Sequence, residues 1–432
     1  MQVIKIYSSK KMPKMVRQRI FERSGNELTN VVKAITPLIK EVEKRGDEAV
    51  LDKYARRQIP IKNLKVSRLE ILDAEKRVSS GFIAAFEQTR ENITAVCTDQ
   101  LTGLRNQKVT TLLNGNLRVW RKWLPEETVG IYAPGGRANY PSTVLMCAIP
   151  ALVAGCQRLV LTVPPQADGT LPPELLVVAD RLGISDIFKV GGAQAIAALA
   201  YGTQTIPRAR LVVGPGNQYV TAAKVALFPQ IRIDSPAGPS ENLIIADEKA
   251  NPAWVAADLI TDCEHGPDST GIVVTDSKDF AVAVQKEIEL QVATLSTCEV
   301  VKESLKQYGA IIVTKDLAEC VELANEYAPE HLQIMTNNPL KIANKITAAG
   351  SVFIGPFSSK AAGDYATGAN HVLPTGGQAR SFGPLSVETF GRFIEFQELD
   401  RNGLTKLQST IQNFADVERL PAHKQSALIR CE

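Results

Sequence analysis

The sequence lacks the features typical of a membrane protein or a nucleic-acid-binding protein. It contains no run of about 18 apolar residues, so we expect no membrane-spanning helix. Residues 1–21 are basic but lack the apolar core of a signal peptide, which predicts a soluble, cytoplasmic protein. The formal net charge of +3 is too small to draw the protein to nucleic acid or to a membrane surface. Small molecules are therefore the predicted partners.

Paired cysteines are lacking as well. The seven cysteines are odd in number and scattered along the chain without a paired spacing. This pattern predicts reduced thiols rather than a disulfide framework, and core packing is the default role of each thiol. Cys263 alone falls inside a candidate site.

The pattern of apolar residues divides the chain, whose 432 residues suffice for two or three domains. Up to about residue 126 the pattern is mostly helical, as in residues 28–57, where apolar positions recur at spacings of three and four. Two runs of alternating strands and helices follow, over residues 128–228 and 253–356. Such runs predict parallel sheets covered by helices on both faces.

We therefore predict an α/β fold in which two Rossmann-like parallel-sheet domains flank a cleft, with a helical N-terminal segment and a helical C-terminal tail. The predicted parts are an N-terminal arm (1–26), an α/β domain with most of the site (27–130 plus 239–384), a second α/β domain (131–238) and the tail (385–432). The charged tail is either a solvated helix or a segment that reaches a neighbouring chain.

None of the Gly-rich turns matches the dinucleotide fingerprint G-x-G-x-x-G. Three turns, PGG at 134–136, VGGAQ at 190–194 and GPGN at 214–217, instead end predicted strands. A single Gly-rich turn of this kind is explained as well by a tight backbone turn as by a ligand site. Three of them at the C-terminal ends of neighbouring parallel strands favour a ligand site, where helix N-termini attract phosphate.

Histidine is scarce. The four histidines are His265, His331, His371 and His423. The first three directly follow Glu or Asn, and Asp364 adds another oxygen donor. A lone histidine is more often a polar residue whose hydrogen bonds are made within the protein than a metal ligand. Two imidazoles with one or two carboxylates, however, suit a divalent ion such as zinc at an open catalytic site. Glu330 and His331 would form an adjacent acid–base pair.

The stretch TDCEHGPDS, residues 261–269, has two local interpretations. It places Asp262, Glu264 and His265 directly before Gly266 and Pro267. A polar helix end before Gly-Pro is common, and half of a metal site is the alternative.

Eight motifs resemble the histidinol dehydrogenase family, in order and over nearly the whole chain. They are IYAPGG with STVLM and AGC, VGGAQAIAALAYGT, GPGNQYV, AGPSE, EHGPDS, APEHLQI, GDYATGANHVLPT and E-x-x-x-x-H-K. The resemblance implies a homodimer with one zinc ion per subunit. It also implies oxidation of L-histidinol to L-histidine in two NAD-linked steps, through an aldehyde held in one site.

The resemblance also assigns residues to roles. Glu330 would activate the water that hydrates the aldehyde, and His331 would take the hydroxyl proton. The implied NAD site, in the domain 131–238, is formed by Tyr132, Gln194 and Asn217. The implied zinc ligands are Asp262, His265, Asp364 and His423. The implied substrate contacts are Ser240, Asp262, His265, His331, Lys360, Asp364, His371, Glu418 and His423, with Glu418 and His423 delivered by the partner subunit's tail.

Two residues depart from the family pattern. Asp262 stands where the family has a zinc-binding glutamine, which makes a two-histidine, two-carboxylate shell formally neutral and the metal a weaker Lewis acid. Lys360 stands where the family has a glutamate that faces the ammonium group of histidinol, and two facing cations repel each other.

Three functions remain open on this basis. The first, which we favour, is histidinol dehydrogenase, with Lys360 either swung outward or paired with Asp262. The second is a paralogous zinc- and NAD-dependent dehydrogenase of another primary alcohol, with an anionic group near Lys360. The third is a non-catalytic, two-lobed binding protein with a decayed site.

Overall fold

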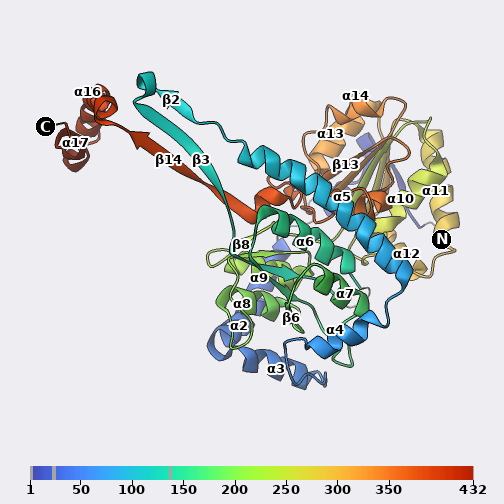
Figure 1. The fold of residues 1–432 in the computed structure, drawn as a ribbon. Coiled ribbons are helices and arrows are strands. Elements are labelled where there is room, and N and C mark those ends of the chain that lie inside the picture. Colours follow the sequence, from blue (N-terminus) through green and yellow to red (C-terminus); the bar gives the residue numbers. More distant parts are fainter. Residues whose placement is uncertain (1–2, 22–25, 136–138, 432) are drawn as a thin grey trace.

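The computed structural model describes residues 3–21, 26–135 and 139–431. Parts of the predicted N-terminal arm and Gly136 of the PGG turn lie outside these residues. Within them the chain folds around two parallel sheets, which confirms the predicted α/β class (Figure 1). The seven cysteines all lie within the described residues and form no disulfide there, as predicted. No helix among the described residues is long and apolar enough to cross a membrane.

The first sheet has five parallel strands, in the order β6-β5-β4-β7-β8. Its strands are β4 (Thr128–Tyr132), β5 (Arg158–Thr162), β6 (Asp186–Phe188), β7 (Leu211–Val213) and β8 (Arg232–Ile233). The helices of this run are α6 (Pro141–Ala154), α7 (Pro173–Arg181), α8 (Ala193–Tyr201) and α9 (Gln218–Leu227). Helices α6 and α7 share one hydrophobic core with the sheet, and α8 and α9 share another, so both faces are covered as predicted.

The second sheet has six parallel strands, in the order β1-β11-β10-β9-β12-β13. Its strands are β1 (Ile6–Ser8), β9 (Glu241–Ala246), β10 (Thr270–Thr275), β11 (Ala310–Val313), β12 (His331–Met335) and β13 (Ser351–Ile354). One face packs on α10 (Pro252–Cys263), α11 (Lys278–Val292) and α12 (Cys298–Tyr308). The other packs on α1 (Lys14–Phe21), α13 (Leu317–Tyr327) and α14 (Pro339–Ala343).

The central strand β9 was absent from the predicted series. It follows β8 without an intervening helix, because the chain crosses there from one sheet to the other. A search for alternating strands and helices therefore passes over it.

The N-terminal helices pack differently from the predicted division. These helices are α2 (Asn26–Arg45), α3 (Asp47–Arg56), α4 (Arg68–Glu75) and α5 (Ser80–Arg105). They contact α9, α8, α7 and α6, and their buried residues, such as Ile39 and Phe86, belong to the two cores of the five-stranded sheet. The buried apolar side chains of these helices therefore pack with the five-stranded sheet, although α5 also donates hydrogen bonds to the backbone oxygens of Tyr365 and Ala366. The predicted boundary at 130 cuts β4. In the opposite sense, β1 of the N-terminal arm pairs with β11 of the six-stranded sheet.

The segment after residue 384 is not wholly helical, which corrects the prediction for the tail. Strand β14 (Gly391–Leu399) pairs antiparallel with β3 (Leu117–Pro125), and β2 (Thr110–Leu112) extends the ribbon. Trp120 stacks on its cross-strand partner Phe396 with ring centroids 5.5 Å apart, a pairing that stabilises such ribbons. The ribbon projects from the body and carries α16 (Arg401–Val417) and α17 (Pro421–Leu428) at its far end (Figure 1).

Candidate active site

Apart from His423, the predicted acid–base and metal residues come from three elements at one end of the six-stranded sheet. Asp262 lies in the last turn of α10, and His265 follows that helix before Gly266. Glu330 and His331 stand at the start of β12. The short helix α15 (Lys360–Tyr365) supplies Lys360 and Asp364. The site therefore lies at the N-terminal edge of this sheet, opposite to the edge where parallel sheets usually bind ligands.

Helix α15 is short, and two local features fix its position. Ser359 caps it by accepting a hydrogen bond from the Ala362 N–H, so that Lys360 and Asp364 fall on one face at an i, i+4 spacing. Gly363 packs against β13, since a Cβ there would lie 2.4 Å from the ring of Phe353. The absence of a side chain at Gly363 thus lets α15 approach the sheet.

The ammonium group of Lys360 lies between two carboxylates. Its Nζ atom is 2.8 Å from Asp262 Oδ1 and 2.7 Å from Asp364 Oδ2. Only 3% of the Lys360 side chain and none of the Asp262 side chain is exposed. Lys360 is therefore paired with Asp262, one of the two arrangements predicted for a histidinol dehydrogenase, and does not swing outward.

The pairing controls the charges of both groups. Burial would lower the pKa of Lys360, but the Asp262 and Asp364 carboxylates outweigh burial and raise that pKa. Burial would likewise raise the pKa of Asp262, but the ammonium of Lys360, followed by His331, holds this pKa well below its usual range. The site therefore contains a buried cation and a buried anion that hold each other in the charged state.

His331 is oriented by acceptors on one side of its ring. Its Nδ1 atom lies 3.2 Å from Asp262 Oδ2 and 3.3 Å from the backbone carbonyl oxygen of Glu241. Because a carbonyl oxygen only accepts, the Nδ1 atom carries the hydrogen and donates it. The Nε2 atom is buried without a hydrogen-bond partner among the described residues, and Asp364 Oδ1, at 3.8 Å, is too distant for one.

Glu330 is buried beside His331. Its Oε2 atom accepts a hydrogen bond of 2.9 Å from the Glu241 N–H and lies 3.7 Å from His331 Nδ1. Burial raises the pKa of Glu330 well above its usual range. Burial lowers the pKa of His331, but the charges of Asp262 and Glu330 outweigh it and raise that pKa. Two titratable groups with shifted pKa values are thus close to each other.

His265 and His371 lie at the border of this cluster. The Nε2 atom of His265 is 3.9 Å from Asp262 Oδ1, and burial lowers the pKa of His265. The His265 ring stacks at 6.4 Å on Tyr140, the residue that precedes α6 of the other sheet. His371 Nδ1 lies 2.9 Å from the Asp364 backbone oxygen, and burial lowers the pKa of His371 to about 4.

Ser240 directly precedes β9 and is next in the chain to Glu241, which contacts the acid–base pair. The Ser240 backbone oxygen accepts a hydrogen bond of 2.9 Å from the Thr270 N–H. The backbone N–H of the following residue, Glu241, donates a hydrogen bond to Glu330, and the backbone carbonyl oxygen of Glu241 contacts His331.

Glu418 and His423 are not part of this cluster within one chain. Glu418 ends α16 and His423 lies in α17, at the far end of the ribbon and away from β12 and α10 (Figure 1). Lys424 bonds to Asp416 across the corner between the two helices, with Nζ–Oδ distances of 2.8 and 3.0 Å.

The predicted cofactor residues gather at the C-terminal edge of the five-stranded sheet. Tyr132 ends β4, and its hydroxyl accepts a hydrogen bond from the Gly192 N–H. Gln194, in the first turn of α8, accepts a hydrogen bond of 2.6 Å from Lys53 Nζ. Asn217 caps α9 by accepting from two backbone N–H groups of its first turn. The VGGAQ and GPGN turns and the described start of the PGG turn therefore lie at one edge of one sheet.

Sequence reasoning missed four residues of the two regions. Glu241 is part of the AGPSE motif, so it could have been noticed, and Tyr140 precedes the helix-starting Pro141. The sequence around Lys53 and around Asp258 contains no motif that indicates a role in either region. Asp258 accepts a hydrogen bond from the Gln333 side chain beneath the site, a contact between segments 75 residues apart.

The side chains as arranged do not fit the zinc ion that the resemblance implies. Zinc would have to contact Asp262 and Asp364, and the Lys360 ammonium already lies between those carboxylates. No group of three or more His, Cys, Asp or Glu side chains within residues 3–21, 26–135 and 139–431 is placed to hold a metal ion.

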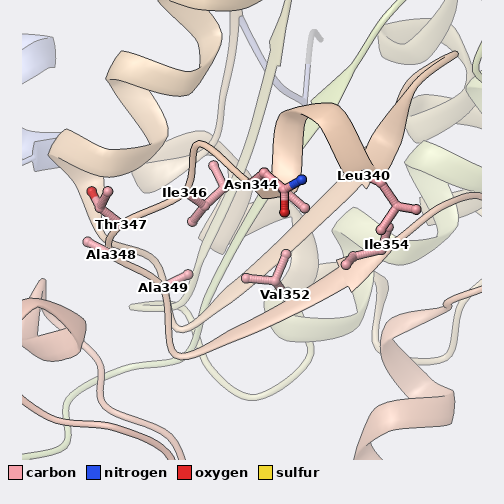
Figure 2. Close-up of a pocket in the computed structure, with 9 residues that line it drawn as sticks. Leu340, Asn344, Ile346, Thr347, Ala348, Ala349, Val352 and Ile354 are labelled. Carbon is pink, nitrogen blue, oxygen red and sulfur yellow. The ribbon is translucent and has the colours of Figure 1, made fainter.

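A separate hollow lies between α14 and β13. Figure 2 shows its lining, which contains no titratable side chain and none of the predicted site residues. The lining residues are Leu340, Ala343, Asn344, Ile346, Thr347, Ala348, Ala349, Val352 and Ile354. Nothing in this lining supports proton transfer or metal binding, so we assign the chemistry to the cluster around His331.

Comparison with known proteins identifies the family. Residues 21–431 match the family model described as histidinol dehydrogenase. The chain is 41% identical to a histidinol dehydrogenase of Methanothermobacter thermautotrophicus, over 94% of this chain and 95% of that protein. It is 42% identical to one of Bacteroides fragilis over 96% of each chain. The crystal structure of histidinol dehydrogenase from Elizabethkingia anophelis matches the fold with a TM-score of 0.92 and 36% identity, over 100% of this chain and 98% of that one. The chain therefore belongs to the histidinol dehydrogenase family.

Proposed function

We propose that this protein oxidises L-histidinol to L-histidine with NAD, and that His331 and Glu330 carry the proton transfers. Family membership supports the reaction. The observation that carries the assignment of roles is the state of His331, whose Nδ1–H is held by acceptors and whose buried Nε2 has no hydrogen-bond partner among the described residues. A neutral imidazole in this tautomer offers its Nε2 lone pair to a substrate hydroxyl.

The reaction consists of two oxidations separated by a hydration. In the first, the alcohol proton passes to His331 Nε2 while a hydride leaves the same carbon for the nicotinamide ring of NAD. Water then adds to the aldehyde: Glu330 accepts a proton from that water, and the protonated His331 returns its proton to the former carbonyl oxygen, which completes the hydrate and leaves His331 as a base again. The hydrate loses a second hydride to a second NAD and a second hydroxyl proton to His331, which gives the carboxyl group of L-histidine.

Burial suits Glu330 to the hydration step. A carboxyl group with an ordinary pKa is a weak base at neutral pH, whereas the pKa of Glu330 is raised by its removal from water. The Glu241 N–H holds one oxygen of the carboxyl group in place. The other oxygen can then receive the proton of the attacking water.

The charge of the cluster favours a cationic substrate. Asp262 and Asp364 carry two negative charges and Lys360 carries one positive charge, so the three side chains sum to one negative charge. The two carboxylates more than balance the charge of Lys360, so the cluster as a whole does not attract an anionic substrate. The ammonium and imidazole groups of histidinol fit this balance better than an anionic alcohol does.

The NAD site is proposed at the turns that carry Tyr132, Gln194 and Asn217. The N-termini of α8 and α9 begin at two of these turns, and helix N-termini favour phosphate groups. The expected cleft between the two sheets stays a prediction, as does the cytoplasmic location. Tyr140 and His265 mark where the two parts meet, near the proposed site of hydride transfer.

A homodimer is proposed from the position of the tail. Helices α16 and α17, which bring Glu418 and His423, lie at the far end of the ribbon, too far from their own site to act there (Figure 1). The same end of the chain exposes large apolar side chains. Among them are Phe414 at 66%, Val417 at 83% and Ile429 at 58% exposure. A second copy of the chain would cover these side chains and would receive Glu418 and His423 as substrate contacts.

The test is a substrate screen of the full-length protein with NAD⁺. We expect two NADH for each L-histidine formed from L-histidinol, and no NADH from primary alcohols that carry a carboxylate in place of the ammonium. The His331→Gln variant, which keeps a polar side chain of similar size, serves as the matched control for turnover. NADH formation only with the anionic alcohols would instead support the paralogous dehydrogenase, and none with any alcohol would support the binding protein.

A further inference from the structure

We propose that the Lys360 ammonium takes the place of the zinc ion in this chain, so that the site contains a cation that belongs to the polypeptide and retains no metal. The proposal deepens the proposed function, on which it rests for the identity of the site. It starts from the disagreement between the side chains present and the metal that the family resemblance implies.

The distances exclude a metal ion and the ammonium from the same position. Zinc binds carboxylate oxygen at about 2.0–2.2 Å. The Nζ atom of Lys360 instead lies at hydrogen-bonding distance from one oxygen of Asp262 and one of Asp364, at 2.8 and 2.7 Å. An ion that bridged these two oxygens would occupy the position that Nζ fills.

The surroundings hold Lys360 in this position. It is the first residue of α15, whose start is fixed by the Ser359 cap and whose packing is fixed by Gly363 against Phe353. If the side chain swung outward, the fully buried Asp262 would lose its cation. An unpaired charge in that environment is strongly unfavourable, so the ammonium stays between the carboxylates.

The charge count leads to the same arrangement. Two carboxylates and one ammonium leave one negative charge. Adding a divalent zinc ion would bring the sum to one positive charge and would place two cations side by side in a buried site. The substrate of the proposed reaction is itself cationic, so this second arrangement would repel it.

The ammonium can also supply part of what a metal supplies. A lysine ammonium has three N–H donors, and the two carboxylates engage two of them. The third N–H is left for the oxygen of the substrate, where a fixed positive group favours the negative charge that develops during oxidation. Asp262, which contacts both Lys360 Nζ and His331 Nδ1, is then a positioning residue for both groups.

The first experiment needs no variant. The full-length protein is purified from zinc-supplemented cells, its metal content is measured by mass spectrometry, and NADH formation from L-histidinol is assayed before and after dialysis against EDTA. We expect less than about 0.1 zinc per chain. We also expect unchanged activity after EDTA, because EDTA lowers activity only when it removes a metal that the enzyme needs. About one zinc per chain, with activity lost on chelation and restored by zinc, would overturn the proposal.

The second experiment restores the family's residues. The double variant Asp262→Gln/Lys360→Glu removes the internal cation. At a given free metal concentration it is expected to bind at least about 100-fold more Zn²⁺ or Co²⁺ than the wild type. The visible absorption of bound Co²⁺ measures this binding. The matched control is Lys224→Gln/Asp234→Asn, which removes a second buried Lys–Asp pair, one that contacts the backbone of Gly214 after β7 of the other sheet, and should leave metal binding unchanged. Thermal unfolding confirms that both variants fold. A folded Asp262→Gln/Lys360→Glu variant that gains no metal would overturn the proposal.

These measurements separate the inference from the proposed function. Zinc-free protein that does not oxidise L-histidinol would refute the proposed function and support the inference. Zinc-loaded, chelator-sensitive protein that does oxidise it would refute the inference alone.

Discussion

The Nδ1 atom of His331 lies 3.2 Å from the carboxylate of Asp262. A carboxylate in this position fixes the imidazole tautomer, as the aspartate does in hydrolases that use a histidine base. We predict that Asp262→Asn lowers kcat for L-histidinol by about 10²- to 10⁴-fold, because the amide can donate to Nδ1 and turn the wrong nitrogen toward the substrate. The pH profile of kcat distinguishes this effect from a loss of folding, because the ascending limb should shift as the pKa of His331 falls. An Asp262→Asn enzyme with unchanged kcat would remove the carboxylate from the mechanism.

Substitutions of Glu330 and of His331 should slow different steps of the reaction. With Glu330→Gln, the first NADH should form at close to the wild-type rate, whereas the second, which needs the hydrated aldehyde, should slow by about 10²- to 10⁴-fold. With His331→Gln, the formation of both NADH molecules should be slower. Single-turnover measurements that count NADH per L-histidinol test this, with circular dichroism as the control for folding. Equal defects in both phases for both variants would contradict the division of roles.

The two subunits should share their sites. A chain with His423→Ala and a chain with His331→Ala should each be inactive alone. If the tail completes the partner's site, unfolding and refolding a 1:1 mixture should restore about one quarter of wild-type activity, because half of the dimers are mixed and each has one intact site. A mixture that stays inactive would place His423 outside the active site. Truncation after residue 400 should likewise abolish activity while leaving both parallel sheets folded.

Asp186 should contribute stability that depends on pH. Burial raises the pKa of Asp186, but the cations of Lys65 and Arg158, at 2.7 and 2.8 Å, outweigh it and lower that pKa. A carboxylate whose pKa is lower in the folded state stabilises the fold above its unfolded pKa of about 3.9 and loses this contribution as the pH falls through the folded value. Asp186→Asn should therefore lower Tm at pH 7 and have progressively less effect below about pH 4. A difference in Tm that is constant from pH 7 to pH 3 would contradict this account.

Gly363 should be required for the position of α15. A Cβ at residue 363 would lie 2.4 Å from the Phe353 ring, so Gly363→Ala should push α15 away from β13 and shift its Lys360 and Asp364 side chains. We expect a loss of kcat/KM for L-histidinol together with a lower Tm, as overpacking costs about 1–3 kcal/mol. Phe353→Leu in the same chain should restore part of both. If the second substitution restores neither, the ring is not what limits the approach of α15.

The sequence predicted the strand–helix series well, because buried parallel strands and amphipathic helices leave clear local patterns. It placed α2 and α5 with the wrong sheet, because an apolar helix face indicates burial but not the partner that buries it. It also missed β14, whose partner β3 lies more than 250 residues earlier in the chain.

The histidine pattern indicated which side chains gather around His331 but not how they are arranged. Glu330 and His331 are adjacent in sequence, so their pairing was predictable. The position of Lys360 depends on α15 packing beside α10, nearly 100 residues away, and on the glycine that permits it. Pairing with Asp262 and outward rotation were both consistent with the sequence, and only the fold distinguishes them.

The cation between Asp262 and Asp364 is a side chain, and this has a consequence for the life of the protein in the cell. A bound ion must be acquired after synthesis and can be lost to a stronger chelator. A lysine is incorporated during translation, once in every copy, and no competitor can extract it. A dehydrogenase built in this way would be fully loaded as soon as it folds and would keep working through zinc starvation.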